Sequence, residues 1–172
     1  MKPIFSVVIP CYNEEENLNR LFIKIETLLE KYPNAEVVLV NNGSSDDTLT
    51  QFNLFKLKHK FQNVTIGNLK ENKGYGYGVL EGLKLAKADV LAWTHGNLVA
   101  DVMDVGKAYD LYLKKVKEVE KCLLVKGVRE TKKVSESIVS FVNLPYLIAH
   151  IPISEYKYLL ANLYDNHSKT FK

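Results

Sequence analysis

Cysteine and arginine are both scarce in this sequence of 172 residues. The two cysteines, Cys11 and Cys122, are too few and too widely spaced to form a metal site or a disulfide framework. Reduced thiols and a cytoplasmic location are therefore expected. Arg20 and Arg129 are the two arginines, and the net charge is only +3. Because nucleic-acid readout favours clustered guanidinium groups, this composition argues against a nucleic-acid-binding protein.

Long hydrophobic runs are also missing. A helix that spans a membrane needs about 18 or more consecutive apolar residues. The longest near-match, Ile138–Ile153, is interrupted by Asn143, Pro145, His150 and Pro152, so we expect no membrane span.

The composition is that of one ordinary globular domain, with 47% hydrophobic and 25% charged residues. The first residues, Met1–Asn13, have a short apolar run but lack the basic region and cleavage site of a signal peptide, so no signal peptide is expected.

Short apolar runs alternate along the chain with stretches in which apolar residues recur every three or four positions. The runs predict buried strands and the stripes predict amphipathic helices. Strands are expected at Phe5–Ile9, Val37–Val40, Val64–Ile66, Val90–Trp93 and Leu123–Val125, and helices at Leu18–Tyr32, Leu49–Leu57, Val79–Ala86 and Val102–Val119. Buried strands separated by helices belong to a parallel sheet that is covered on both faces. The predicted fold class is α/β, a doubly wound three-layer α/β/α arrangement with a mostly parallel sheet.

Polar loops follow the first four predicted strands. In doubly wound sheets, ligands bind outside the carboxyl ends of the strands, near a switch in strand order. The loops are the segments 10–17, 41–48, 72–78 and 94–101. We expect a planar base to lie against Pro10 and Tyr12, with its polar edge facing Asn13, Glu14 and Asn42. Such polar groups discriminate strongly, because a wrong ligand leaves a buried polar atom unpaired.

Two of these loops also admit a purely structural interpretation. Ser44 and Asp47 have the spacing of a helix capping box, in its less common aspartate form. Glu15 and Glu16 suit the positive end of a helix macrodipole.

The other two loops carry glycines and weak metal ligands. Gly74, Gly76 and Gly78 either allow close helix packing or shape a ligand loop. They lack the G-x-G-x-x-G spacing directly after a strand, so a nicotinamide dinucleotide is not expected. His95 and Asn97 alone are weak evidence for a metal, because neither is an anionic oxygen ligand.

Together and in order, the loops carry a family resemblance. The runs SVVIPCYNEEENL, VVLVNNGSSDDT, NKGYGYGVLEGLKLA, ADVLAWTHGNLVAD and LVKGVR resemble the family 2 glycosyltransferases of GT-A fold, near the dolichyl-phosphate mannose and polyprenyl-phosphate sugar synthase branch. The resemblance covers residue 4 to about residue 129. It implies a nucleotide-sugar-binding GT-A domain over 1–129 and a divergent, helical C-terminal segment of the same domain over 130–172.

The resemblance implies transfer of a sugar from a nucleotide-diphosphate donor, with inversion. The acceptor would be a lipid phosphate or a growing glycan, in polysaccharide or glycolipid synthesis. The alternative is a nucleotide-sugar-binding domain without catalysis, and donor turnover distinguishes the two.

The resemblance also assigns roles to particular positions. Asn42 stands where the family usually has an aspartate that faces the base, and its amide keeps one acceptor oxygen. Arg129, in the VKG-x-R segment, would face a phosphate, which suits its bidentate fork. The positions implied to hold the nucleotide sugar are Pro10, Tyr12, Asn13, Glu14, Asn42, Lys73, Gly74 and Asn97.

The metal motif departs from the family pattern. Relatives carry Asp-x-Asp, which holds a divalent cation such as Mg²⁺ or Mn²⁺ against the leaving diphosphate. Here the corresponding segment is His95-Gly96-Asn97, followed at some distance by Asp101. Asn97 and Asp101 are the residues left for a cation, and a hard cation would lose most of its protein ligands.

The C-terminal part departs as well. Relatives continue past the VKG-x-R segment, whereas the residues after Arg129 carry no recognised motif. No catalytic base is assigned, and Glu136 and Glu155 are candidates by chemical type only.

A basic stretch precedes the broken apolar run. Residues 107–133 contain nine basic and four acidic side chains, and Ile138–Ile153 follows directly. One hypothesis is peripheral contact with the inner face of a membrane. The alternative is a solvated amphipathic helix over Val102–Val119, with Ile138–Ile153 packed against the sheet.

Overall fold

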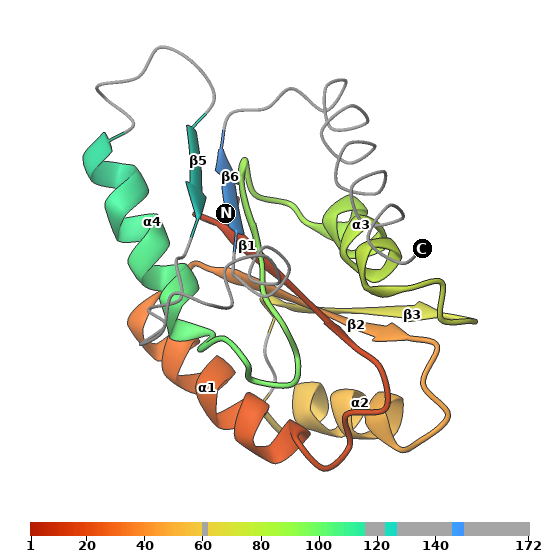
Figure 1. The fold of residues 1–172 in the computed structure, drawn as a ribbon. Coiled ribbons are helices and arrows are strands. Elements are labelled where there is room, and N and C mark those ends of the chain that lie inside the picture. Colours follow the sequence, from red (N-terminus) through yellow and green to blue (C-terminus); the bar gives the residue numbers. More distant parts are fainter. Residues whose placement is uncertain (60–61, 116–122, 127–145, 150–172) are drawn as a thin grey trace, which may run out of the picture.

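The computed structural model describes residues 1–59, 62–115, 123–126 and 146–149. Its sheet has six strands in the order β3-β2-β1-β4-β6-β5 (Figure 1). The bounds are Ser6–Cys11 for β1, Glu36–Asn42 for β2, Val64–Leu69 for β3, Val90–Trp93 for β4, Leu123–Lys126 for β5 and Tyr146–Ala149 for β6. Strands β1 to β4 are mutually parallel, as the alternating pattern predicts.

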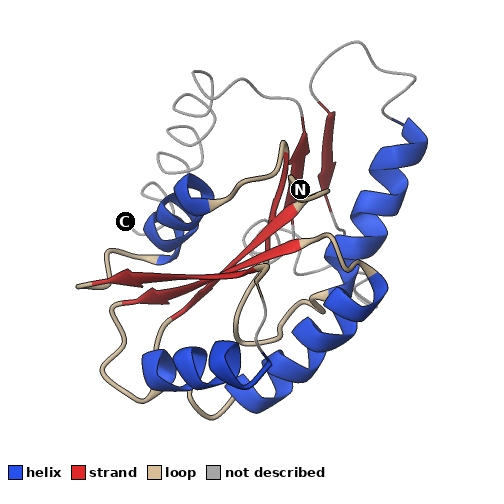
Figure 2. Ribbon diagram, turned by 180° about the vertical axis from the view of Figure 1, so that it is seen from behind, coloured by secondary structure: helices blue, strands red, loops and turns tan. Residues whose placement is uncertain are grey.

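Helices cover both faces of this sheet, which gives the three-layer arrangement expected from the sequence (Figures 1 and 2). The helices are α1 at Leu18–Lys31, α2 at Thr48–His59, α3 at Tyr75–Leu85 and α4 at Met103–Lys115. One face of the sheet packs against α1, α2 and α4, and the other packs against α3. Alternate residues of β1 divide between the two cores, since Val7 and Ile9 face the first and Val8 faces the second.

Helix α1 follows the predicted apolar stripe and ends at Lys31, two residues before Pro33. Helix α2 does not follow its predicted stripe. Phe52 and Phe55 are buried, but Leu57 is 75% exposed, so its expected core position is wrong. At about 100° per residue, Leu57 points about 140° away from Phe52, whereas Phe55 is within about 60° of it.

The far edge of the sheet differs from expectation. Strand β5 was expected to extend a parallel sheet, but it runs antiparallel to β6, and β6 runs antiparallel to β4. The segment 130–172 was expected to be helical, yet its described residues, Tyr146–Ala149, form a strand between β4 and β5. A run of four apolar residues suits a buried strand, and only the neighbouring strands decide that it forms one.

The remaining part of the broken apolar run lies outside the described residues, as do residues 116–119 of the fourth predicted helix. No helix within the described ranges combines the length and apolar character needed to cross a bilayer.

The amino ends of the strands carry a buried carboxylate. Glu36 is 1% exposed, and its Oε2 accepts hydrogen bonds from Ser6 Oγ at 2.6 Å and from the Lys87 backbone N–H at 2.8 Å. Its Oε1 accepts from Thr65 Oγ1 at 3.2 Å and pairs with Lys87 Nζ at 3.4 Å. This network joins the starts of β1, β2 and β3 to the segment that leads into β4, at the edge opposite the polar loops.

Candidate functional site

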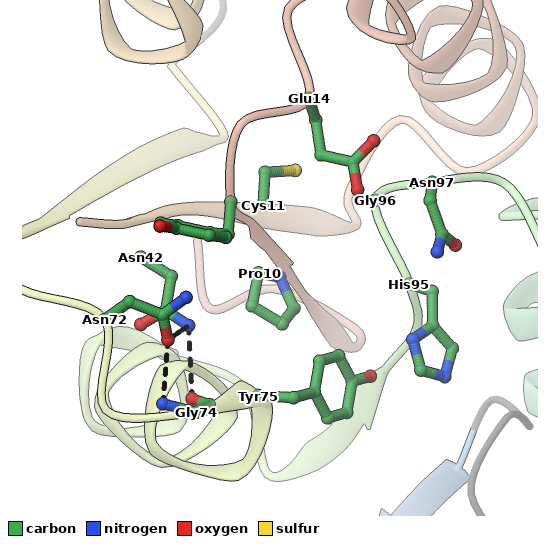
Figure 3. A pocket seen from close by; sticks show the side chains of 11 residues that line it. Pro10, Cys11, Glu14, Asn42, Asn72, Gly74, Tyr75, His95, Gly96 and Asn97 are labelled. Carbon is green, nitrogen blue, oxygen red and sulfur yellow. Dashed lines mark hydrogen bonds between the residues drawn. The ribbon is translucent and has the colours of Figure 1, made fainter. Parts of the chain in front are cut away.

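A cavity of about 290 Å³ lies at the carboxyl ends of β1, β2 and β4 (Figure 3). Strand β1 pairs with β2 on one side and with β4 on the other, so the cavity lies at the switch in strand order where doubly wound sheets bind ligands. It is lined by Pro10, Cys11, Tyr12, Glu14, Asn42, Asn72, Gly74, Tyr75, His95, Gly96 and Asn97.

Six of the residues nominated from the sequence line this cavity together. They are Pro10, Tyr12, Glu14, Asn42, Gly74 and Asn97. Tyr12 is 47% exposed, which leaves its ring accessible to a ligand. The Glu14 carboxylate accepts a hydrogen bond from Asn17 Nδ2 at 2.7 Å, so a residue just before α1 orients it.

Asn13 was expected to contact the nucleotide, but it is not among the residues that line the cavity. Its backbone N–H donates to Ser44 Oγ at 3.0 Å, and its Oδ1 accepts from the Ser45 backbone N–H at 2.9 Å. The backbone of Asn13 is left-handed, with φ of 53°, a conformation that asparagine tolerates better than most residues. Asn13 therefore joins the loop after β1 to the loop after β2.

The same two loops are joined again at the start of α2. The Glu14 backbone N–H donates to Thr48 Oγ1 at 3.0 Å, and the Glu15 backbone N–H donates to Asp46 Oδ2 at 3.1 Å. Glu15 Oε2 in turn accepts from the Asp47 backbone N–H at 2.8 Å. These contacts hold the segment that carries Tyr12 and Glu14 against the rest of the site.

The structural interpretations of these loops need correction. A capping box requires the Ser44 hydroxyl to accept a hydrogen bond from the Asp47 backbone N–H, but this hydroxyl accepts from the Asn13 backbone N–H. Asp46 caps the start of α2 instead, because its Oδ1 accepts from the Thr48 backbone N–H at 3.0 Å. Burial raises the pKa of Asp46, but the hydrogen bonds from Thr48 and Glu15 outweigh it and hold that pKa below its ordinary value.

The interpretation of the glutamates changes too. Helix α1 has no acidic residue in its first turn, so Glu15 and Glu16 lie outside the turn where its dipole would act on them.

Asn42 fixes the loop before α3 to the end of β2. It is 3% exposed, and its Nδ2 donates to the Gly74 carbonyl at 3.1 Å and to Asn72 Oδ1 at 3.4 Å (Figure 3). Because a carbonyl only accepts, these bonds fix the orientation of the amide. The Asn42 Oδ1 atom is buried and receives no hydrogen bond from the described residues.

The three glycines at and after the start of α3 differ in their surroundings. Gly74 has φ of 97° and precedes α3, a conformation that favours glycine. At Gly78 a Cβ would lie 3.0 Å from both Asn42 Cγ and Pro10 Cβ, so glycine allows α3 to approach the cavity closely. At Gly76 a Cβ would meet nothing within 4 Å, so close packing does not explain that glycine.

Lys73 was expected to close over the donor, but it is not among the residues that line the cavity. Its ammonium pairs with Glu71 Oε1 at 2.7 Å and lies 5.5 Å from the centroid of the Tyr77 ring. The hydrogen bond to Glu71 raises the pKa of Lys73.

The loop after β4 forms the remaining wall. His95 is 8% exposed and stacks on Tyr75, with ring centroids 4.5 Å apart and an interplanar angle of 15° (Figure 3). Gly96 lies directly against Cys11 Sγ, where a Cβ would collide with the sulfur. Burial, with the charges of Glu14 and Asp46, raises the pKa of the Cys11 thiol far above its ordinary value, so this thiol fills space and does not act as a nucleophile.

The Asn97 side chain is partly used by its own loop. Its Oδ1 accepts from the Val99 backbone N–H at 3.2 Å, across Leu98, whose backbone is left-handed with φ of 59°. The oxygen that would ligate a metal is thus held in a turn.

Asp101 is not among the residues that line the cavity. It pairs with Lys24 at 2.7 Å and accepts from the Met103 backbone N–H at 3.0 Å, where α4 begins. Burial raises the pKa of Asp101, but Lys24 and Met103 outweigh it and hold that pKa below its ordinary value. Within the described residues, no three His, Cys, Asp or Glu side chains lie close enough to hold a metal ion. An amide oxygen that is held by Val99 and a carboxylate that is held by Lys24 and Met103 do not suit a hard cation.

Several lining residues were not nominated from the sequence, namely Cys11, Asn72, Tyr75, His95 and Gly96. All lie in the polar loops that the sequence analysis predicts to hold a ligand, so the sequence indicated their segments but not the individual residues. The stacking of Tyr75 on His95 joins residues 20 positions apart in sequence, and no local pattern indicates it. Arg129, Glu136 and Glu155 lie outside the described residues, and their roles stay predictions.

Comparison with known protein families shows which family the chain belongs to. The profile of glycosyl transferase family 2 matches residues 6–160, most of the chain and well past the segment that carries the resemblance. The chain belongs to glycosyl transferase family 2.

Similar members of the family are known from several organisms. A dolichol-phosphate mannosyltransferase of Pyrococcus furiosus is 40% identical over 85 residues, which cover 49% of this chain and 23% of that protein. A poly-beta-1,6-N-acetyl-D-glucosamine synthase of Staphylococcus epidermidis is 31% identical over 96 residues, which cover 56% of this chain and 22% of that protein. The matched part thus spans about a quarter of the length of these relatives.

A solved structure confirms the fold. The mannosyltransferase of Pyrobaculum calidifontis, in complex with GDP-Man and Mn²⁺, has a TM-score of 0.50 and 23% identity, covering 56% of this chain and 28% of that chain. At this identity the likeness concerns the fold, which is the GT-A fold expected from the sequence.

Proposed function

We propose that the cavity binds a nucleotide-diphosphate sugar and that the protein transfers the sugar to an acceptor with inversion. The observation that carries this proposal is the meeting of Pro10, Tyr12, Glu14, Asn42 and Asn97 at the carboxyl ends of three parallel strands. These segments are far apart in the sequence and carry the family motifs. Membership of glycosyl transferase family 2 supports the same reaction.

The base would lie against Pro10 and Tyr12. Tyr12 presents an accessible ring, and an aromatic face stacks favourably on any base. The buried, unpaired Asn42 Oδ1 supports recognition of a base that presents an N–H group, since an unsatisfied acceptor calls for a donor. The sugar and diphosphate would then extend towards Asn97 and His95.

The acceptor is a lipid phosphate or a growing glycan in this proposal. The similarity to a dolichol-phosphate mannosyltransferase supports the first and the similarity to a poly-beta-1,6-N-acetyl-D-glucosamine synthase supports the second. Arg129 is proposed to face a phosphate. We assign no step to a divalent cation, because the residues at and around position 97 do not suit one.

We also propose that the protein is cytoplasmic and contacts the inner face of the membrane. Exposed Lys107 and Lys114 lie on the same side of α4 as exposed Leu111, within about 60° of it at about 100° per residue, which supports contact with an anionic surface. The described residues Tyr146–Ala149 form a strand between β4 and β5. Flotation with anionic liposomes at low and high salt tests the contact: the protein should float at low salt only, and sedimentation in both conditions contradicts it.

Thermal denaturation with GDP, UDP and ADP tests nucleotide binding. A ligand at 100 times its Kd stabilises the folded state by about 2.7 kcal/mol, which raises the Tm of a domain of this size by about 5–10 °C. Tyr12→Ala should weaken binding by about 1–3 kcal/mol while leaving the Tm of the free protein unchanged, because the ring is largely exposed. Tyr77→Ala is the matched control, since Tyr77 does not line the cavity.

Asn42→Leu should abolish the shift, because it removes the acceptor and releases the loop at Gly74. No shift with any nucleotide, or equal shifts in all three variants, contradicts the assignment. Release of free sugar or transfer to an acceptor then distinguishes a transferase from a binding domain without catalysis, which would keep the shift and show no turnover.

A further inference from the structure

The two polar atoms of the Asn97 side chain, Oδ1 and Nδ2, differ in their hydrogen bonding. Its Oδ1 accepts a hydrogen bond from the Val99 backbone N–H, which holds the oxygen within the loop after β4. Its Nδ2 is a donor with two N–H groups, and the residue lines the cavity. Position 97 thus offers the cavity a hydrogen-bond donor, whereas a carboxylate there would offer an acceptor.

The neighbouring residue on the same wall is held in place by stacking. His95 lines the cavity, and its stacking on Tyr75 fixes the plane of the imidazole (Figure 3). Gly96 lies between the two residues and packs on Cys11, which fixes the backbone that carries both side chains.

The charges around the cavity do not favour a divalent cation. Glu14 is the one carboxylate among the described lining residues, and its Oε2 already accepts from Asn17. A hard cation prefers several anionic oxygen ligands, and Asp101 is held by Lys24 and the start of α4. The described lining residues include no lysine or arginine either. The N–H groups of the Asn97 amide are what this wall offers to an anion.

We propose that the Nδ2 of Asn97 binds the diphosphate of the nucleotide directly by hydrogen bonds, in the place where a divalent cation would otherwise act. The inference rests on the proposed function, because it concerns the diphosphate of the same ligand. Hydrogen bonds from neutral donors to a charged acceptor are among the stronger ones in proteins, and those from the Asn97 amide support binding without metal. Nucleotide binding is then independent of Mg²⁺ and Mn²⁺.

Calorimetric titration with GDP and UDP, in EDTA and in Mn²⁺, tests this inference. The natural protein should bind its preferred nucleotide with Kd values that differ by less than about threefold between the two conditions. Asn97→Asp is the decisive variant, because the carboxylate still accepts from the Val99 N–H but replaces the donor by an acceptor. Its binding in EDTA should fall by about 10- to 100-fold and should recover in Mn²⁺.

Two further variants isolate the contributions. Asn97→Ala removes the amide donor without introducing a charge, and should weaken binding in EDTA by about tenfold. Asn53→Ala removes an exposed amide on α2 that does not line the cavity, and should leave both Kd values unchanged.

The outcomes separate this inference from the proposed function. Binding in Mn²⁺ but not in EDTA by the natural protein overturns the inference and leaves the proposed function standing. Equal binding in EDTA by Asn97→Asp and by the natural protein also overturns it. Failure of the natural protein to bind either nucleotide in both conditions overturns the proposed function and this inference together.

Discussion

Asn13 Oδ1 accepts a hydrogen bond from the backbone N–H of Ser45 at 2.9 Å, which joins the loops after β1 and β2. The Asn13 backbone N–H completes the link by donating to Ser44 Oγ at 3.0 Å. Neither loop contains regular structure at this point, so the mutual bonds fix where Tyr12 and Glu14 lie. Asn13 is a positioning residue for the cavity.

Asn13→Gly and Asn13→Ala should separate the hydrogen bond from the backbone conformation. Glycine loses the bond to Ser45 but accepts φ of 53°, and should cost about 1 kcal/mol of unfolding free energy. Alanine loses the bond and is strained at this φ, and should cost about 1–2 kcal/mol more. Urea denaturation measures both. Equal stability of the two variants would mean that the left-handed conformation is not retained.

Glu36 should contribute to stability and not to ligand binding. Glu36→Ala leaves Ser6 Oγ and the Lys87 backbone N–H without their buried acceptor, and should cost about 3–5 kcal/mol. Lys87→Ala removes only a largely exposed ammonium and should cost about 0–1 kcal/mol. Urea denaturation gives both values.

Nucleotide affinity of the folded protein serves as the control for Glu36, because its network lies at the edge of the sheet opposite the cavity. A large loss of affinity in folded Glu36→Ala protein would contradict the separation of the two edges.

Asp101 should make the stability of the protein sensitive to acid. Its pKa is lower in the folded protein than its ordinary value, so its contribution is present above that ordinary value and is lost as the pH falls through the folded pKa. Asp101→Asn should therefore be less stable near pH 7 and should lose less stability between about pH 5 and pH 2. Thermal denaturation across this range measures the difference. Asp89→Asn, which breaks an exposed pair with Lys2, is the control and should follow the natural protein.

The Cys11 thiol should resist alkylation in the native state. It is 1% exposed, and burial raises its pKa, so little thiolate forms at neutral pH. In a Cys122→Ser background, iodoacetamide at pH 8 should label the protein in 8 M urea but not in buffer, as mass spectrometry would record. Rapid labelling in buffer would mean that the wall formed by Cys11 and Gly96 opens.

The apolar pattern determined much of this fold from the sequence alone. Runs such as Val37–Val40 and Val90–Trp93 are buried on both faces, and continuous apolar character is what a covered parallel strand requires. The stripe from Leu18 to Leu29 determined α1, since five of its residues are buried. The loops that line the cavity were also identified from the sequence, because the carboxyl ends of parallel strands meet at one edge.

Only the tertiary structure decided where β6 pairs and which atoms face the cavity. The run Tyr146–Ala149 becomes a strand because β4 and β5 supply its hydrogen-bond partners, and no local pattern specifies partners so distant in sequence. Asn13, Asn42 and Asn97 are chemically identical in the sequence, yet Asn13 joins two loops, Asn42 anchors the loop at Gly74, and Asn97 turns its oxygen towards Val99. The direction of an amide depends on the donors and acceptors that folding brings around it, and these come from other segments of the chain.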